Sequence, residues 1–174
     1  MSLLWPIVGA VVWGVGVAAV GGTLTTLGPW YDALKRPKLQ PPDWAFGPAW
    51  TAILAMAALS AVLAWRDAPT DADRTAVVGL FVVNGALNVL WNVFFFTQRR
   101  PDRALIEVGF LWLSILAPII VFWRFQTTAA LLLTPYLVWV GFASYLNYAI
   151  VRLNGPFGVS RPEPATDVDG VRDA

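Results

Sequence analysis

The chain has 174 residues, of which 57% are apolar and only 13% are charged. A net charge of +1 gives no field that would attract nucleic acid, so no nucleic-acid partner is expected. Without cysteine there is no disulfide or thiolate nucleophile, and without histidine there is no imidazole base. No metal site is predicted, because the thiolate and imidazole ligands are missing.

Five apolar stretches follow one another along the chain, and they predict transmembrane helices. Each holds roughly 20–25 residues, enough to cross a hydrocarbon layer of ~30 Å. They cover residues 3–27, 46–65, 75–97, 104–123 and 128–151. The first has no basic residue before it and exceeds the apolar core of a signal peptide, so we interpret it as a retained helix. The prediction is an all-α membrane domain over residues 1–154, followed by a polar, disordered tail over residues 155–174.

The first stretch carries small residues at four-residue spacing. Gly14, Ala18 and Gly22 would share one side of a helix, which predicts a helix contact or the seam of a dimer. Ala10, in the first turns, should tolerate a larger side chain if it faces lipid.

Glu107 is the only acidic residue inside any of the five stretches. It follows Arg103 by one turn. We therefore expect it to form an ion pair or to reach the membrane interface, rather than to carry protons.

Basic residues are distributed unequally between the two sides that an odd number of helices defines. The N-terminal side carries only Arg66, Arg74 and Arg124. The C-terminal side carries Lys35, Arg36, Lys38, Arg99, Arg100, Arg103, Arg152 and Arg161. The positive-inside rule then predicts an outside N-terminus, with the first loop, third loop and C-terminus on the cytoplasmic side.

The loop after the first stretch, residues 28–50, contains five prolines and several aromatic residues. Proline fixes the backbone φ angle and removes a donor, so this loop should be stiff and partly extended. It could cap a pocket at the mouth of the bundle, or it could anchor the chain at the membrane surface.

Three asparagines on the third stretch, Asn84, Asn88 and Asn92, repeat every four residues beside Trp91. The 3.6-residue period places their amides on one stripe. An amide facing hydrocarbon is costly, so the stripe must face protein, water or a ligand. Hydrogen bonding between helices and contact with a ligand both remain open.

The last stretch combines aromatic and small side chains. Tyr136, Val140, Ala143 and Asn147 fall on one face, with Trp139 at its edge. This combination favours either close helix packing or a slot for a flat ligand.

Tryptophan is abundant, with ten residues in the chain. Trp5, Trp65 and Trp123 lie at the ends of stretches and are typical interfacial anchors. Trp50 and Trp139 lie deeper, where they could line a cavity and stack on a conjugated or sterol-like ring.

Three sequence motifs together resemble the TspO/MBR family, also called tryptophan-rich sensory proteins, translocator proteins or peripheral benzodiazepine receptors. The likeness covers residues 5–154. The motifs are WYDALKRPKLQPPDWAFGPAW in the first loop, WN on the third stretch and PYLVWVGFASYLN on the fifth. The resemblance implies a five-helix bundle, commonly dimeric, with a pocket beneath the first loop. It also implies binding of porphyrins, including haem and protoporphyrin IX, of cholesterol in some members and of benzodiazepine-type ligands. For some bacterial members it implies light-dependent breakdown of protoporphyrin.

Matching these motifs residue by residue gives the expected site. The implied ligand-binding residues are Tyr31, Pro42, Trp50, Asn84, Asn88, Trp139, Phe142, Ala143 and Asn147. A loose cholesterol pattern falls on Leu146, Tyr148 and Arg152, although such patterns match many helix ends by chance.

Three functions compete at this point. We expect a membrane receptor or binding protein for tetrapyrroles. Sterols or lipids are possible further ligands, and no cofactor is required. The alternatives are an enzyme that degrades porphyrin with light, using Trp50 and Trp139, and a small transporter. Without histidine, cysteine or a buried carboxylate pair, conventional acid–base or nucleophilic catalysis lacks its parts. A proton-driven transporter would need an acid within the membrane, for which Glu107 is the sole candidate.

Overall fold

The computed structural model describes residues 3–158, so most of the predicted tail lies outside the described residues. Within this range the chain is helical without strands, and five helices are long and apolar enough to cross a membrane. They are α1 (Leu4–Leu24), α3 (Phe46–Asp67), α4 (Asp71–Asn92), α5 (Pro101–Phe122) and α6 (Thr127–Asn154). The predicted all-α bundle of five membrane-spanning helices is confirmed, with boundaries that differ by a few residues.

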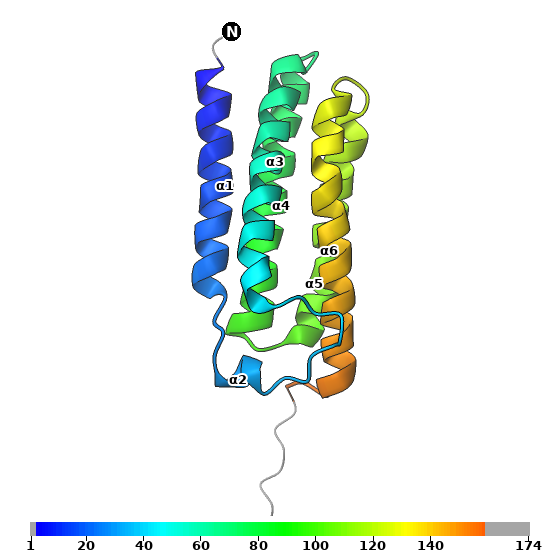
Figure 1. Ribbon diagram of the computed structural model, residues 1–174. Helices are drawn as coiled ribbons and strands as arrows, with labels where there is room; N and C mark the ends of the chain where they lie inside the picture. Colours follow the sequence, from blue (N-terminus) through cyan, green and yellow to red (C-terminus); the bar gives the residue numbers. More distant parts are fainter. Residues whose placement is uncertain (1–2, 159–174) are drawn as a thin grey trace, which may run out of the picture.

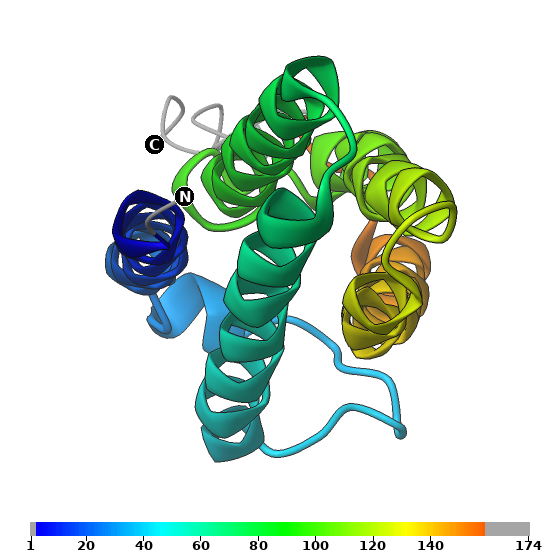
Figure 2. The same ribbon diagram turned by 90° about the horizontal axis from the view of Figure 1, so that it is seen from above.

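The five long helices stand side by side, and the α1–α3 connection crosses one end of the bundle (Figure 1). Figure 2 shows α1 on one side and α5 with α6 on the other, with α3 and α4 between them. Accordingly, α1 packs against α3 and α4, whereas α6 packs against α3 and α5. Because α1 packs mainly against α3 and α4, it forms one flank of the bundle.

Hydrogen bonds from side chains to backbone carbonyls join two pairs of helices. The Trp13 indole donates to the Phe81 carbonyl across the α1–α4 contact, at 2.7 Å. A Cβ at Gly85 would lie only 2.7 Å from the same indole nitrogen, so this contact requires glycine. The Ser60 hydroxyl donates to the Ala129 carbonyl at 2.7 Å and joins α3 to α6.

The α1–α3 connection is ordered, as predicted. It contains a short helix, α2 (Pro29–Asp32), and a 3₁₀ turn, η1 (Asp43–Ala45). The side chain of Asn154, at the end of α6, binds the Lys35 backbone in both directions. It accepts from the Lys35 N–H at 2.8 Å and donates to the Lys35 carbonyl at 2.9 Å. This pair of hydrogen bonds ties the connection to the end of the bundle.

The end of α4 departs from the regular helix that the sequence predicts. Residues Val93–Thr97 form a π-helical turn, η2, and Arg99 then adopts a φ of 54°. Wide turns of this kind often occur at functional sites because they redirect side chains. Here the turn places Phe95 and Phe96 on the lining of the cavity described below.

The small residues of α1 have roles within a single chain. A Cβ at Gly14 would lie 3.8 Å from the Leu54 carbonyl, so this position packs against α3. Ala18 and Gly22 line the cavity instead. Ala10 is only 7% exposed, and the premise that it faces lipid is wrong. On a uniformly apolar helix, hydropathy cannot distinguish the packed side from the lipid side.

Candidate ligand-binding cavity

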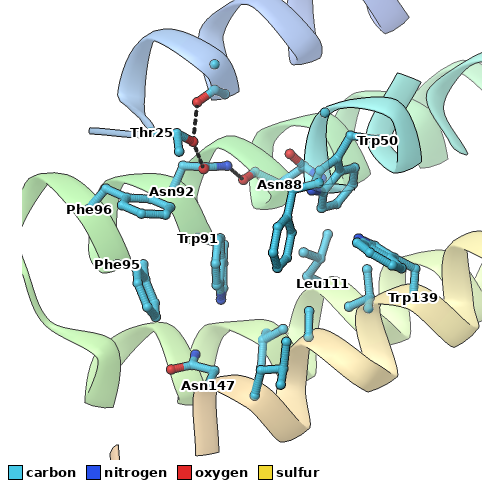
Figure 3. A pocket seen from close by; sticks show the side chains of 18 of the residues that line it. Thr25, Trp50, Asn88, Trp91, Asn92, Phe95, Phe96, Leu111, Trp139 and Asn147 are labelled. Atoms are coloured by element: carbon cyan, nitrogen blue, oxygen red, sulfur yellow. Dashed lines mark hydrogen bonds between the residues drawn. The ribbon is translucent and has the colours of Figure 1, made fainter. Parts of the chain in front are cut away.

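A cavity of about 460 Å³ lies beneath the α1–α3 connection and is lined by residues from all five long helices. The volume falls within the range of sites for small molecules. Aromatic side chains form much of its wall. Figure 3 shows the indoles of Trp50, Trp91 and Trp139, which come from α3, α4 and α6, around the same space. Flat apolar rings could stack on these faces.

The indoles are held by edge-to-face and stacked contacts. The Trp50 ring lies 5.8 Å from Tyr136 in an edge-to-face arrangement, and Trp139 meets Phe46 at the same distance. Trp91 stacks on Phe95, with ring centroids 5.0 Å apart. Such contacts fix the orientation of each ring, so the cavity wall is preformed.

The asparagine stripe forms a chain of hydrogen bonds between helices. The Asn88 amide donates to the Tyr136 hydroxyl at 2.9 Å, and that hydroxyl donates to the Asn84 side-chain carbonyl at 3.2 Å. The Asn84 amide donates in turn to Ser114 at 2.9 Å. At the cavity mouth, Thr25 donates to the Asn92 side-chain oxygen at 3.1 Å. The stripe therefore faces protein, and Asn88 and Asn92 also border the cavity.

Three buried polar atoms on the lining have no hydrogen-bond partner in the described part of the chain. They are the indole nitrogens of Trp91 and Trp139 and the side-chain oxygen of Gln40. Buried donors and acceptors cost free energy unless they are paired. A ligand with an acceptor near either indole would supply the missing partner.

The loop side of the cavity is closed by a cluster around Tyr31. The Tyr31 hydroxyl donates to Asp43 at 3.3 Å and accepts from Gln40 at 3.0 Å. Arg36 lies over the Tyr31 ring, 4.3 Å from its centroid, and pairs with both Asp32 and Asp43 at 3.2 Å. Burial, with a smaller effect of the Asp43 carboxylate, raises the pKa of Tyr31 above its ordinary value. The hydroxyl therefore remains a donor at neutral pH.

Most of the residues implied by the resemblance meet at this cavity. Those on the lining are Tyr31, Trp50, Asn88, Trp139, Ala143 and Asn147. With its amide oriented to pair both atoms, Asn147 donates to the Pro101 carbonyl at 3.0 Å and accepts from the Leu105 N–H at 3.1 Å.

Pro42, Asn84 and Phe142 do not line the cavity. Pro42 is exposed and precedes η1. Asn84 lies one turn deeper than Asn88, and its side-chain amide is hydrogen-bonded to Ser114 and Tyr136. Phe142 packs beside Trp139, with ring centroids 6.1 Å apart. Phe142 therefore supports an indole of the cavity wall without lining the cavity itself.

The cholesterol pattern is divided between two sides of α6. Leu146 is buried and lines the cavity, whereas Tyr148 and Arg152 are exposed. Arg152 donates to the Tyr148 hydroxyl at 3.2 Å, one turn away. The three residues do not form one surface, because two residues along a helix correspond to a rotation of about 200°.

Several cavity residues were missing from the sequence-based site. Trp91 and Asn92 are the WN motif itself, so their inclusion could have been inferred from the stripe that they continue. Gln40 had no signal beyond its place in the proline-rich loop. Phe95 and Phe96 reach the lining through the π-helical turn, which hydropathy does not reveal.

Glu107 lies in the protein interior and not at the interface, contrary to prediction. It is 5% exposed, and neither carboxylate oxygen has a hydrogen-bond partner among residues 3–158. It shares a face of α5 with Ser114, two turns away, which binds Asn84 of α4. It therefore points into the bundle, whereas Arg103 is exposed and binds Gln98 instead.

The position of Glu107 leads to a prediction about stability. Glu107→Gln should leave the free energy of unfolding in detergent within about 1 kcal/mol of wild type, because it removes no ion pair and only a carboxyl that is costly to ionise. A loss of several kcal/mol in thermal or denaturant unfolding would show that the carboxylate has a partner that stabilises the fold. Ile106→Leu, at the exposed neighbouring position, serves as the control, because it keeps an apolar side chain toward the lipid.

These features define the class: an integral, multi-pass membrane protein whose helices enclose an aromatic cavity. A family model described as the TspO/MBR family matches residues 7–153. The chain is 39% identical over 129 residues to the tryptophan-rich protein TspO of Chlorobaculum tepidum, covering 72% of this chain and 79% of that protein.

Two further relatives extend the comparison. The tryptophan-rich sensory protein of Cereibacter sphaeroides is 32% identical over 163 residues, covering 94% of this chain and 98% of the relative. The translocator protein of Homo sapiens is 31% identical over 126 residues, covering 72% and 75%. The chain belongs to the TspO/MBR family.

Proposed function

We propose that this protein is a membrane receptor or binding protein for tetrapyrroles such as protoporphyrin IX and haem, with sterols as a second ligand class. The observation that carries the proposal is the meeting of Trp50, Trp91 and Trp139 around one cavity. Ala143 lies on the same wall, where its small side chain lets a ring approach the backbone of α6. Relatives named sensory and translocator proteins fit a role in binding rather than in conventional catalysis.

The direct test is titration of the detergent-solubilised protein with protoporphyrin IX in darkness. Binding is measured by the quenching of tryptophan fluorescence. Saturable binding is expected. Trp50→Ala and Trp139→Ala should each weaken it, since an aromatic pair contributes roughly 0.5–1.5 kcal/mol beyond its buried area. Trp5 is 76% exposed, and Trp5→Ala should leave affinity unchanged. Equal losses in all three variants would argue against binding in the cavity.

The same titration under light distinguishes binding from breakdown. A pigment whose absorption spectrum stays unchanged supports a receptor. Light-dependent bleaching that disappears in Trp139→Phe would instead support the alternative enzyme, in which a redox-active indole, light and oxygen act together.

The proposed orientation places the cavity end of the bundle at the cytoplasmic side. The connection that crosses this end carries Lys35, Arg36 and Lys38. The α4–α5 connection and the C-terminal end of α6 lie at the same end (Figure 1). Arg161, which contributed to the sequence argument, lies outside the described residues.

A topology assay tests this orientation. A reporter fused after Asn154 should be cytoplasmic, and one fused before Leu3 should not, because the excess of basic residues is retained inside. The opposite pattern would reject the orientation, and two reporters on one side would reject the odd number of spans.

A further inference from the structure

The cavity is closed on one flank and open on the other. Its lining residues on α5 and α6 are mainly buried, as with Leu111, Val140 and Asn147. On the opposite flank, Ala18 and Gly22 of α1 and Thr51 of α3 also line the cavity, yet all three are exposed. A lining residue that is exposed to the outside lies at an opening. The opening is therefore between α1 and α3.

The shape of this opening follows from where α1 and α3 touch. At Gly14 the two helices are in contact, since a Cβ there would meet Leu54 and Ala58. Two turns further along α1, a Cβ at Gly22 would meet nothing within 4 Å, and the same holds at Gly47 on α3. The helices thus separate toward the α2 end, and glycine on both sides keeps the gap wide.

The opening faces the hydrocarbon layer. Ala18 and Gly22 lie within α1, which is a candidate membrane span without any charged residue. Ala18 precedes the end of α1 by six residues, or about 9 Å at 1.5 Å per residue, so the gap extends well below the end of the helix. On the water side the opening continues to Leu27 and Asp43, which line the cavity and are exposed, while the rest of the loop is held over the cavity by the Tyr31 cluster and by the bonds of Asn154 to Lys35.

The chemistry of the route restricts the ligand. Among residues 3–158, Asp43 is the only formally charged residue on the cavity lining, and no Lys or Arg of this range lines it. An ionised carboxylate carried into this space would lose its hydration without gaining a cationic partner, so the propionates of a porphyrin should stay at the opening while its apolar ring enters. An apolar, uncharged molecule already dissolved in the bilayer meets no such cost.

We infer that ligands enter and leave the cavity sideways from the bilayer, through the gap between α1 and α3, and that the part of the ligand inside the cavity is apolar and uncharged. The inference deepens the proposed function and rests on it for the identity of the ligand. The access route itself depends only on the cavity.

The absence of cysteine from the chain allows a test that needs no natural ligand. Ala143→Cys places one thiol on the cavity wall of the protein in liposomes. Phenylmaleimide, which dissolves in the bilayer, should label it faster than a sulfonated, water-bound maleimide. Adding Gly22→Phe should slow labelling by phenylmaleimide about tenfold or more, because the ring fills the gap. The matched control is Gly16→Phe on α1, where a Cβ also meets nothing but which does not line the cavity.

Three results would overturn the inference. The first is an equal rate of phenylmaleimide labelling in the Gly22→Phe and Gly16→Phe backgrounds. The others are faster labelling by the sulfonated maleimide than by phenylmaleimide, and no labelling by either reagent. Gly47→Phe closes the gap from α3 and should give the same slow labelling if the effect of Gly22→Phe is not a local distortion of α1. Thermal unfolding shows that each variant is folded.

A second measurement uses protoporphyrin IX dimethyl ester, which lacks carboxylate charge. Gly22→Phe should slow both its association and its dissociation, and wild type should bind the ester at least as tightly as the diacid. A Gly22→Phe protein whose association and dissociation rates both match those of wild type would contradict a portal. Failure of wild type to bind either porphyrin would count against the proposed function, while the labelling experiment would still decide the route.

Discussion

Replacing Tyr136 by Ala is expected to lower the free energy of unfolding by about 3–5 kcal/mol, the usual cost of deleting a fully buried aromatic ring. Tyr136 is 1% exposed, packs against Trp50 and joins Asn84 to Asn88 through its hydroxyl. Tyr136→Phe isolates the hydroxyl. It leaves a buried amide donor and a buried carbonyl without a partner and should cost about 1–3 kcal/mol.

Denaturant unfolding in mixed micelles, followed by circular dichroism, measures both losses. Tyr145→Phe is the matched control on α6, because Tyr145 is 48% exposed and should change stability by less than about 0.5 kcal/mol. Equal stability of Tyr136→Phe and wild type would show that the asparagine stripe does not depend on this hydroxyl.

Replacing Ala143 by Leu should reduce tetrapyrrole affinity by roughly tenfold or more. Ala143 lines the cavity on α6, one turn beyond Trp139, so three added carbons would occupy the space of the ligand. Overpacking of this kind typically costs about 1–3 kcal/mol, and ~1.4 kcal/mol is one decade in Kd. Fluorescence titration in darkness measures the change.

The control for Ala143→Leu is Ala86→Leu, at an exposed position of α4 that does not line the cavity. Thermal unfolding of both variants without ligand separates a filled cavity from a damaged helix contact. Undiminished porphyrin affinity in a stable Ala143→Leu protein would mean that the ligand does not lie against this face of α6.

Hydropathy alone was enough to predict the five spans, because apolar length and the exclusion of charge are properties of each segment by itself. The same reasoning failed for side-chain environment. Glu107 looked like an interfacial charge from its distance to a helix end, yet its face of α5 is buried inside the bundle. The buried side of α1, which includes Ala10, could not be read from a helix that is apolar on every side.

Helical periodicity and family motifs predicted part of the candidate site. The periodic face of α6 did bring Ala143 and Asn147 to the cavity. The stripe on α4 was harder to interpret, because Asn84 and Asn88 share a face but differ by one turn in depth. Only the three-dimensional packing shows that Ser114 and Tyr136 take up the deeper amide. The contribution of Phe95 and Phe96 depends on a π-helical turn that no periodicity predicts.

A structure of the protein with protoporphyrin IX bound in darkness tests the central proposal most directly. The ring should lie in the cavity beneath the α1–α3 connection, between the indoles of Trp50 and Trp139 and against Ala143. A ring bound only on the lipid-facing surface, with the cavity unchanged, would contradict the proposed function.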